Sequence, residues 1–230
     1  MTALRTRVLR FIWQLYPDRI RGYRFWRQLK RIAQARPRLF FIQIGANDGV
    51  VADPLRQFIL KYRWRGILVE PLPAAFQALK RNYHGVEGLQ FENSAIGKEA
   101  GEATLYYLKN SEQLVRWCGS IASFSKEHVL KHRWAVPGME HLIEEVRVPT
   151  LSFPQLLEKY HVRQLDLVCI DVEGFDWEVM QQIPFDRWRP AAIMYEHVHL
   201  KDVEKAACER LLEGHGYTLA RTSRDTLAVR

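Results

Sequence analysis

The sequence has few cysteines and no long apolar run, and both absences exclude classes of protein. Three of its 230 residues are cysteine, and they are far apart, with no CxxC pair. Neither a disulfide framework nor a cysteine-based zinc site is therefore expected. No apolar run approaches the ~18 residues of a membrane span, and the arginine-containing N-terminus lacks the cleavage site of a secretory signal. These features predict a cytoplasmic protein.

The positive charge is concentrated at the N-terminus. Residues 1–38 contain eleven Lys or Arg and one acid, Asp18, a net charge of +10, whereas the whole chain carries +8. Residues 39–230 therefore carry −2, so the basic pI does not indicate a domain that binds nucleic acid. We expect no nucleic-acid partner, and we divide the chain into a basic segment, residues 1–38, and a domain, residues 39–230.

The basic segment has helical periodicity in two stretches, one before Pro17 and one from Tyr23 to Ala33. Aromatic residues are interspersed with its arginines. Two interpretations stay open. The helices pack on the core or on a dimer partner, or they form a basic amphipathic surface in peripheral contact with an anionic membrane.

From Leu39 onward, apolar runs alternate with helical patterns. This alternation is typical of a parallel sheet covered on both faces, so the fold class is α/β. The hairpin-length link 223–225 predicts an antiparallel edge. The predicted strands are Leu39–Ile44, Gly66–Glu70, Leu89–Ile96, Leu165–Asp171, Ala191–Glu196, Tyr217–Thr222 and Thr226–Arg230, and the predicted helices are Pro54–Tyr62, Pro73–Tyr83, Phe153–Tyr160, Trp177–Gln182 and Val203–His215.

An insertion at about 97–150 interrupts this alternation. Two stretches in it, Glu102–Lys109 and Val146–Leu151, have strand character, and a helix is predicted near Ser125–Arg133. Excursions of this length inside a compact domain are usually functional.

The ends of four predicted strands carry polar or glycine-rich motifs. Residues 45–49 read Gly-Ala-Asn-Asp-Gly, Glu70 ends the second strand, residues 93–96 read Asn-Ser-Ala-Ile, and Asp171 ends the fourth strand. Ligands of open α/β sheets bind beyond these carboxyl ends, and an acid at the end of the second strand can accept hydrogen bonds from ribose hydroxyls. We therefore expect an adenosine-containing ligand.

The dinucleotide fingerprint G-x-G-x-x-G is absent, because Asn47 and Val50 stand where its second and third glycines would be. Asp48 would also repel a pyrophosphate. An NAD-dependent oxidoreductase is thus disfavoured. S-adenosylmethionine carries an adenosine, an ammonium and a sulfonium but no phosphate, so it suits an acidic site.

The motifs FFIQIGANDG, ILVEPLP, FENSAIG, IDVEGFDWEVM and AAIMYEH resemble those of FkbM-type S-adenosylmethionine-dependent methyltransferases, over about residues 39–230. The resemblance implies a Rossmann-like seven-stranded sheet of order 3-2-1-4-5-7-6 with an antiparallel last strand. It also implies O-methylation of a hydroxyl on a sugar, glycolipid or polyketide-like acceptor. Gln43 departs from the wider methyltransferase pattern, in which an acid is commonest at this position.

Site residues follow from the strand ends and the resemblance. We expect the general base to be Glu173, His197 or Asp171, with His197 suited to neutral pH. A scaffold that keeps the fold without the reaction is the alternative, against which the intact motif acids argue. The residues expected to bind the cofactor are Gln43, Gly45, Asn47, Asp48, Gly49, Glu70, Pro71, Ser94, Ala95 and Asp171.

No metal site is predicted. His128 and His132 lie one helical turn apart, but no third ligand for zinc or iron is evident from the sequence. The carboxylates of Asp171, Glu173 and Glu196 suit Mg²⁺ bound with a sugar diol, although their spacing does not require an ion. The segment Gly119–His128 is expected to line the acceptor pocket or form a lid, with Ser125 as a helix N-cap.

Overall fold

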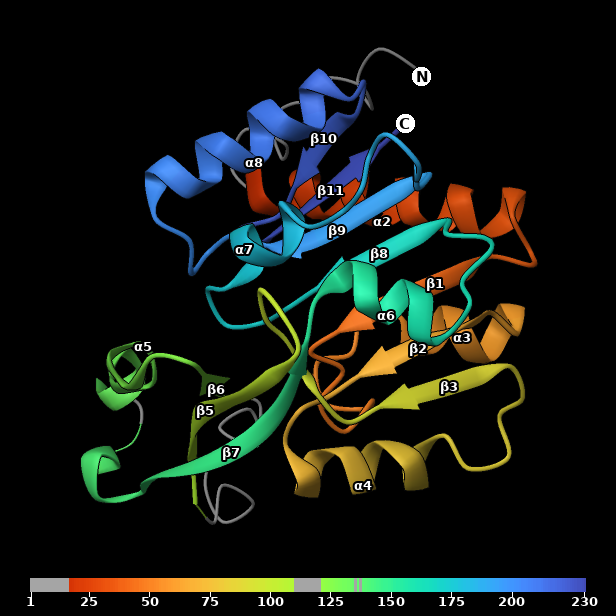
Figure 1. Cartoon of the computed structure of the whole chain (residues 1–230). Helices are drawn as coiled ribbons and strands as arrows, with labels where there is room; N and C mark the ends of the chain where they lie inside the picture. The colour runs from red at the N-terminus through yellow and green to blue at the C-terminus, as the bar shows by residue number, and fades with distance from the viewer. Residues whose placement is uncertain (1–16, 110–120, 135, 137) are drawn as a thin grey trace, which may run out of the picture.

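The computed structural model describes residues 17–109, 121–134, 136 and 138–230. Its centre is a seven-stranded sheet of order β10-β11-β9-β8-β1-β2-β3, which is the predicted order 3-2-1-4-5-7-6 (Figure 1). All neighbouring strands are parallel except β11, which is antiparallel to both β9 and β10. The strands are β1 Phe40–Ile44, β2 Arg65–Val69, β3 Leu89–Glu92, β8 Leu167–Ile170, β9 Ala192–Glu196, β10 Thr218–Arg221 and β11 Asp225–Val229.

Each face of the sheet buries its own apolar layer, because successive strand residues point to opposite faces. Phe41 of β1 packs in one layer and Ile42 in the other. The layer containing Phe41 is covered by α2 Pro17–Ala35, α3 Arg56–Tyr62 and α4 Pro73–Asn82. The layer containing Ile42 is covered by α6 Phe153–Lys159, α7 Asp176–Met180 and α8 Asp202–Gly214.

Helix α2 belongs to this core. Phe25, Leu29 and Ala33 are completely buried and recur at four-residue spacing, as one face of a helix requires. Tyr23 and Trp26 remain exposed on the same helix. For this helix, packing on the core is the interpretation that holds. The helical stretch predicted before Pro17 lies outside the described residues, and none of the described helices is long and apolar enough to cross a membrane.

The insertion builds a second sheet of order β4-β7-β5-β6. Its strands are β4 Ala95–Ile96, β5 Gly101–Leu108, β6 Ala122–Ser123 and β7 Ile143–Leu151, and β5 and β7 form a long antiparallel pair. Helix α5 Lys126–Leu130 and two short 3-10 turns, η3 Lys131–Trp134 and η4 Met139–His141, complete it. This sheet lies beside the carboxyl ends of the main strands (Figure 1).

One predicted strand is wrong. The stretch Leu89–Ile96 is not continuous, because the chain leaves the main sheet after β3 and enters the second sheet at β4. Asn93, at the break, donates its side-chain amide to the backbone carbonyls of Glu70 and Pro71, at 2.8 and 3.0 Å. These bonds turn the chain across the end of β2 and bring Ser94 and Ala95 to the edge of the site.

Candidate active site

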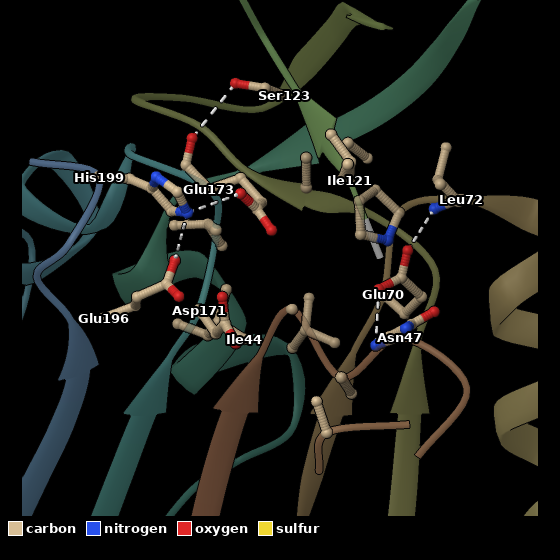
Figure 2. A pocket seen from close by; sticks show the side chains of 18 of the residues that line it. Ile44, Asn47, Glu70, Leu72, Ile121, Ser123, Asp171, Glu173, Glu196 and His199 are labelled. Atoms are coloured by element: carbon tan, nitrogen blue, oxygen red, sulfur yellow. Dashed lines mark hydrogen bonds and ion pairs between the residues drawn. The ribbon is translucent and has the colours of Figure 1, made fainter. Parts of the chain in front are cut away.

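A cavity of about 720 Å³ lies beyond the carboxyl ends of β1, β2, β8 and β9. This volume falls within the ~300–1,000 Å³ of small-molecule sites. Its two ends differ in chemistry. Glu70 and Asn47 lie at one end, whereas Asp171, Glu173, Glu196 and His199 lie at the other (Figure 2).

The turn after β1 brings the backbone close to β8. Gly45 has φ +80°, and a Cβ at this position would lie 1.8 Å from the carbonyl oxygen of Asp171. Only glycine fits this approach. The neighbouring Asn47 also has a positive φ, of 46°, and its backbone N–H donates to Glu70 Oε2 at 2.9 Å. The glycine turn therefore joins the ends of β1, β2 and β8 into one floor.

Glu70 is buried at the end of β2 and is held by two backbone donors. Its Oε1 accepts from Leu72 N–H at 2.8 Å, and its Oε2 accepts from Asn47 N–H. Burial raises the pKa of Glu70 to about 7, and the two N–H donors oppose this shift. Each oxygen retains a second lone pair, so the carboxylate can accept two further bonds from a ligand in the cavity.

Gln43 Oε1 and Ser94 Oγ are buried polar atoms of the cavity wall that lack a hydrogen-bond partner among the described residues. Gln43 is 2% exposed, and its Nε2 donates to Asp53 Oδ1 at 3.3 Å, which directs its carbonyl oxygen elsewhere. Buried acceptors without partners are costly. Both atoms are therefore suited to bind a polar ligand.

Two residues expected to bind the cofactor, Asp48 and Gly49, do not line the cavity. Asp48 does not line the cavity; its Oδ1 accepts from the N–H groups of Val50 and Val51, at 2.8 and 2.7 Å. Gly49 packs against the side chains of Leu79 and Tyr83. Both residues shape the turn. Asp48 thus does not place its charge on the cavity wall, so it would not repel a pyrophosphate there as expected from the sequence.

Acidic and imidazole groups converge at the other end of the cavity. Glu173 Oε2 lies 3.3 Å from His128 Nε2 and 3.4 Å from His199 Nε2. His199 Nε2 also lies 3.5 Å from Glu196 Oε2. Glu173 has a φ of +51°, a backbone conformation that non-glycine residues rarely adopt and that is frequent at functional sites.

The electrostatics of this end reflect burial among like charges. Burial, and then the charges of Glu196 and Glu173, raise the pKa of Asp171 well above its ordinary value. Burial and the charge of Glu173 raise the pKa of Glu196 to about 7, although Arg224 donates to its Oε1 at 2.6 Å. Burial lowers the pKa of His199 to about 4, so its ring is neutral at pH 7.

The second sheet closes this end of the cavity. Ile121, Ala122, Ser123 and Phe124 line it, as expected for the segment Gly119–His128, of which Gly119 and Ser120 lie outside the described residues. Ser125 caps α5, its Oγ accepting from His128 N–H at 3.2 Å. The cap orients the helix that carries His128 toward Glu173.

The structure does not bring His197 to this site. Its Nδ1 lies 3.0 Å from Thr226 Oγ1, and its side chain lines a separate hollow with Arg24 and Arg221. The histidine two residues later, His199, faces Glu173. His197 was one of the three residues expected to act as the base, but the turn after β9 places His199, and not His197, on the wall of this cavity.

Pro71 and Ala95 line the cavity as expected. Asp53 also lines it and was missed. It accepts from Gln43, from the hydroxyl of Tyr83 at 2.9 Å and from the N–H of Leu55 at 2.8 Å. Its one signal in the sequence is its place before Pro54, as the N-cap of a predicted helix.

A seven-stranded sheet of this order, with a glycine turn, a strand-end acid and an acidic cavity above it, defines the class of Rossmann-like methyltransferases. The chain belongs to the Methyltransferase FkbM domain family, whose model matches residues 43–219.

Two known proteins resemble this chain, one in sequence and one in fold. Methyltransferase 1 of Beauveria bassiana (strain ARSEF 2860) is 23% identical over 197 residues, which cover 79% of this chain and 73% of that protein. The crystal structure of methyltransferase FkbM from Methylobacillus flagellatus KT superposes with a TM-score of 0.51 at 12% identity, covering 84% of this chain and 44% of the other. This chain therefore corresponds to less than half of that solved protein, and the likeness is one of fold.

Proposed function

We propose that this protein transfers the methyl group of S-adenosylmethionine to a hydroxyl oxygen of a sugar, glycolipid or polyketide-like acceptor. The observation that carries the proposal is the division of the cavity. One end offers a buried strand-end carboxylate and unpartnered polar atoms, and the other offers several proton-accepting groups. The first end suits a cofactor, and the second suits an acceptor that must lose a proton.

The residues of the first end fit S-adenosylmethionine. Glu70 would accept hydrogen bonds from the two ribose hydroxyls. Gln43 Oε1 would accept from the ammonium, without the charge assistance that an acid would give. Gly45 leaves space for the methionine portion, and Ser94 and Ala95 would flank the adenine. When bound, the cofactor supplies a methyl carbon activated by a cationic sulfur.

The chain's contribution to the reaction is to orient the acceptor and to take its proton. A sugar hydroxyl is a weak nucleophile until its proton begins to leave, so a base within hydrogen-bonding reach accelerates attack. Asp171 follows β8 directly and lines the cavity next to Gly45. We infer that the Asp171 carboxylate accepts the proton that leaves the acceptor hydroxyl. Glu173 and His199 would hold the acceptor oxygen in place.

Incubation of the full chain with methyl-labelled S-adenosylmethionine and fractionated glycans and lipids tests the activity. Label should enter a fraction that carries free hydroxyls and should be lost when these are acetylated beforehand. Asp171→Asn should lower the rate by ~100-fold or more while cofactor binding persists. Label that enters only amine- or thiol-containing fractions would refute O-methylation.

Two other functions are disfavoured. A dinucleotide oxidoreductase would bring a pyrophosphate into a cavity lined by the acids Asp53, Glu70, Asp171, Glu173, Glu196 and Asp225. A scaffold without activity would have no need of a buried carboxylate at the end of β2 or of a glutamate in a strained conformation.

A further inference from the structure

The acceptor end contains a cluster that a base and an acceptor pocket do not explain. His128, Glu173 and His199 come from three separate parts of the chain, namely α5, the loop after β8 and the loop after β9. Their ligand atoms all lie within 4.8 Å of one another. In the sequence, His128 and His132 form a pair without an evident third ligand. The fold instead brings His128 together with the carboxylate of Glu173 and with His199.

The separations fit a common ion better than they fit direct hydrogen bonds. Both Nε2 atoms face the same oxygen, Glu173 Oε2, at 3.3 and 3.4 Å. Charge-assisted N–H···O bonds are usually ~2.7–2.9 Å long. Two ligand atoms that each lie about 2.1 Å from one ion, at the tetrahedral angle, are about 3.4 Å from each other.

A fourth group provides an independent observation. The side chain of Glu196 is 5% exposed, and its Oε2 lies 3.5 Å from His199 Nε2. This oxygen has no hydrogen-bond partner among the described residues, and neither does His199 Nε2. Arg224 occupies only the other oxygen, Oε1. A buried carboxylate oxygen and an imidazole nitrogen thus lie close together, and neither makes a hydrogen bond to a described residue.

We propose that His128, Glu173 and His199, with Glu196 as a fourth ligand, bind one divalent transition-metal ion at the wall of the cavity. Imidazole together with carboxylate suits Zn²⁺, Mn²⁺, Fe²⁺ or Co²⁺, whereas Mg²⁺ and Ca²⁺ prefer oxygen ligands alone. Glu196 is oriented by Arg224, as ligating carboxylates usually are by outer groups.

The ion would also define the acceptor. Glu173, Glu196 and His199 line the cavity, whereas His128 is buried and does not line it. An ion on these ligands would therefore have its free side toward the acceptor. There it would bind a hydroxyl oxygen and a neighbouring oxygen of a vicinal diol or an α-hydroxy acid. This role rests on the proposed function, but the binding of the ion does not.

Binding of Zn²⁺, Mn²⁺ and Co²⁺ to the chelator-treated full chain is measured by equilibrium dialysis and elemental analysis. We expect about one ion per chain. Loss of an outer-shell partner weakens metal sites by ~10–100-fold, so loss of a ligand in His199→Ala or Glu173→Gln should weaken binding by more than ~100-fold. His197→Ala, which changes the histidine two residues away, should bind as the unaltered chain does.

Thermal unfolding provides a second measurement. The ion should raise the unfolding temperature of the unaltered chain and of His197→Ala, but not that of His199→Ala, whose metal-free unfolding serves as the folding control. No binding of any of the three ions, or equal binding in the ligand variants, would overturn the proposal. S-adenosylmethionine binding to the metal-free chain is measured separately, so that a failed cofactor site and a failed metal site are distinguished.

Discussion

Replacement of Glu70 by glutamine tests the cofactor end of the cavity. The change keeps the size of the side chain but removes its charge. Bonds to a charged acceptor contribute ~1.5–3 kcal/mol and neutral ones ~0.5–1.5 kcal/mol. If both ribose hydroxyls donate to Glu70, affinity for S-adenosylmethionine should fall by about 2–3 kcal/mol. At about 1.4 kcal/mol per factor of ten, that is roughly 30- to 150-fold.

The pH dependence of S-adenosylmethionine binding tests whether the cofactor binds the ionised form of Glu70. Burial raises the pKa of Glu70 to about 7. Ribose hydroxyls bind the ionised carboxylate best, so binding should lower this pKa and release a proton. Affinity in the unaltered chain should be constant above pH 7. Below pH 7 it should fall, by up to tenfold per unit, and Glu70→Gln should abolish this dependence.

Isothermal calorimetry between pH 5.5 and 8 measures both effects. Glu92→Gln is the matched control, because Glu92 is also buried at a strand end, next to β2, but does not line the cavity. Its affinity should stay unchanged. In Glu70→Gln, one of the two backbone N–H groups that donate to Glu70 would face the side-chain NH2 group and lose its acceptor. The variant should therefore also lose ~1–3 kcal/mol of stability. Equal affinities of Glu70→Gln and the unaltered chain would refute the assignment.

Three further predictions concern the fold and the N-terminus. Gly45→Ala should lower the free energy of unfolding in urea by more than ~3 kcal/mol, because its Cβ would collide with Asp171; Gly85→Ala, with a similar φ but open space, should cost less, and equal losses would contradict the packing argument. Leu29→Ala should cost ~2–5 kcal/mol if α2 is part of the core, whereas a loss as small as that of the exposed Lys30→Ala would show that it is not. If the basic segment, 1–38, contacts an anionic membrane while α2 stays packed on the core, the full chain should sediment with vesicles containing anionic lipid at low salt, and binding should fall steeply as salt rises; an absence of sedimentation at low salt would refute membrane contact.

The strands of the main sheet could be predicted from the sequence because they are continuous apolar runs between helical patterns. The order of the strands came from the family resemblance and is confirmed. Strand-end reasoning located Glu70 and Asp171 at the cavity, since parallel strands direct their carboxyl ends to one edge. The helical pattern predicted from Tyr23 to Ala33 likewise lies within α2.

What could not be predicted depends on loops and on contacts between distant residues. The choice between His197 and His199 depends on the turn after β9, where the N–H of His197 donates to the carbonyl of Arg224. The approach of His128 to Glu173 depends on how the second sheet packs beside the first. Neither follows from local patterns, because residues 45 positions apart meet there.

Calorimetry of the full chain with S-adenosylmethionine, its demethylated product and NAD tests the central claim most directly. The cavity should bind the first two compounds and bind NAD far more weakly, because its acids oppose a pyrophosphate. NAD that binds as tightly as S-adenosylmethionine, or a failure of the full chain to bind S-adenosylmethionine at all, would contradict this account of the cavity.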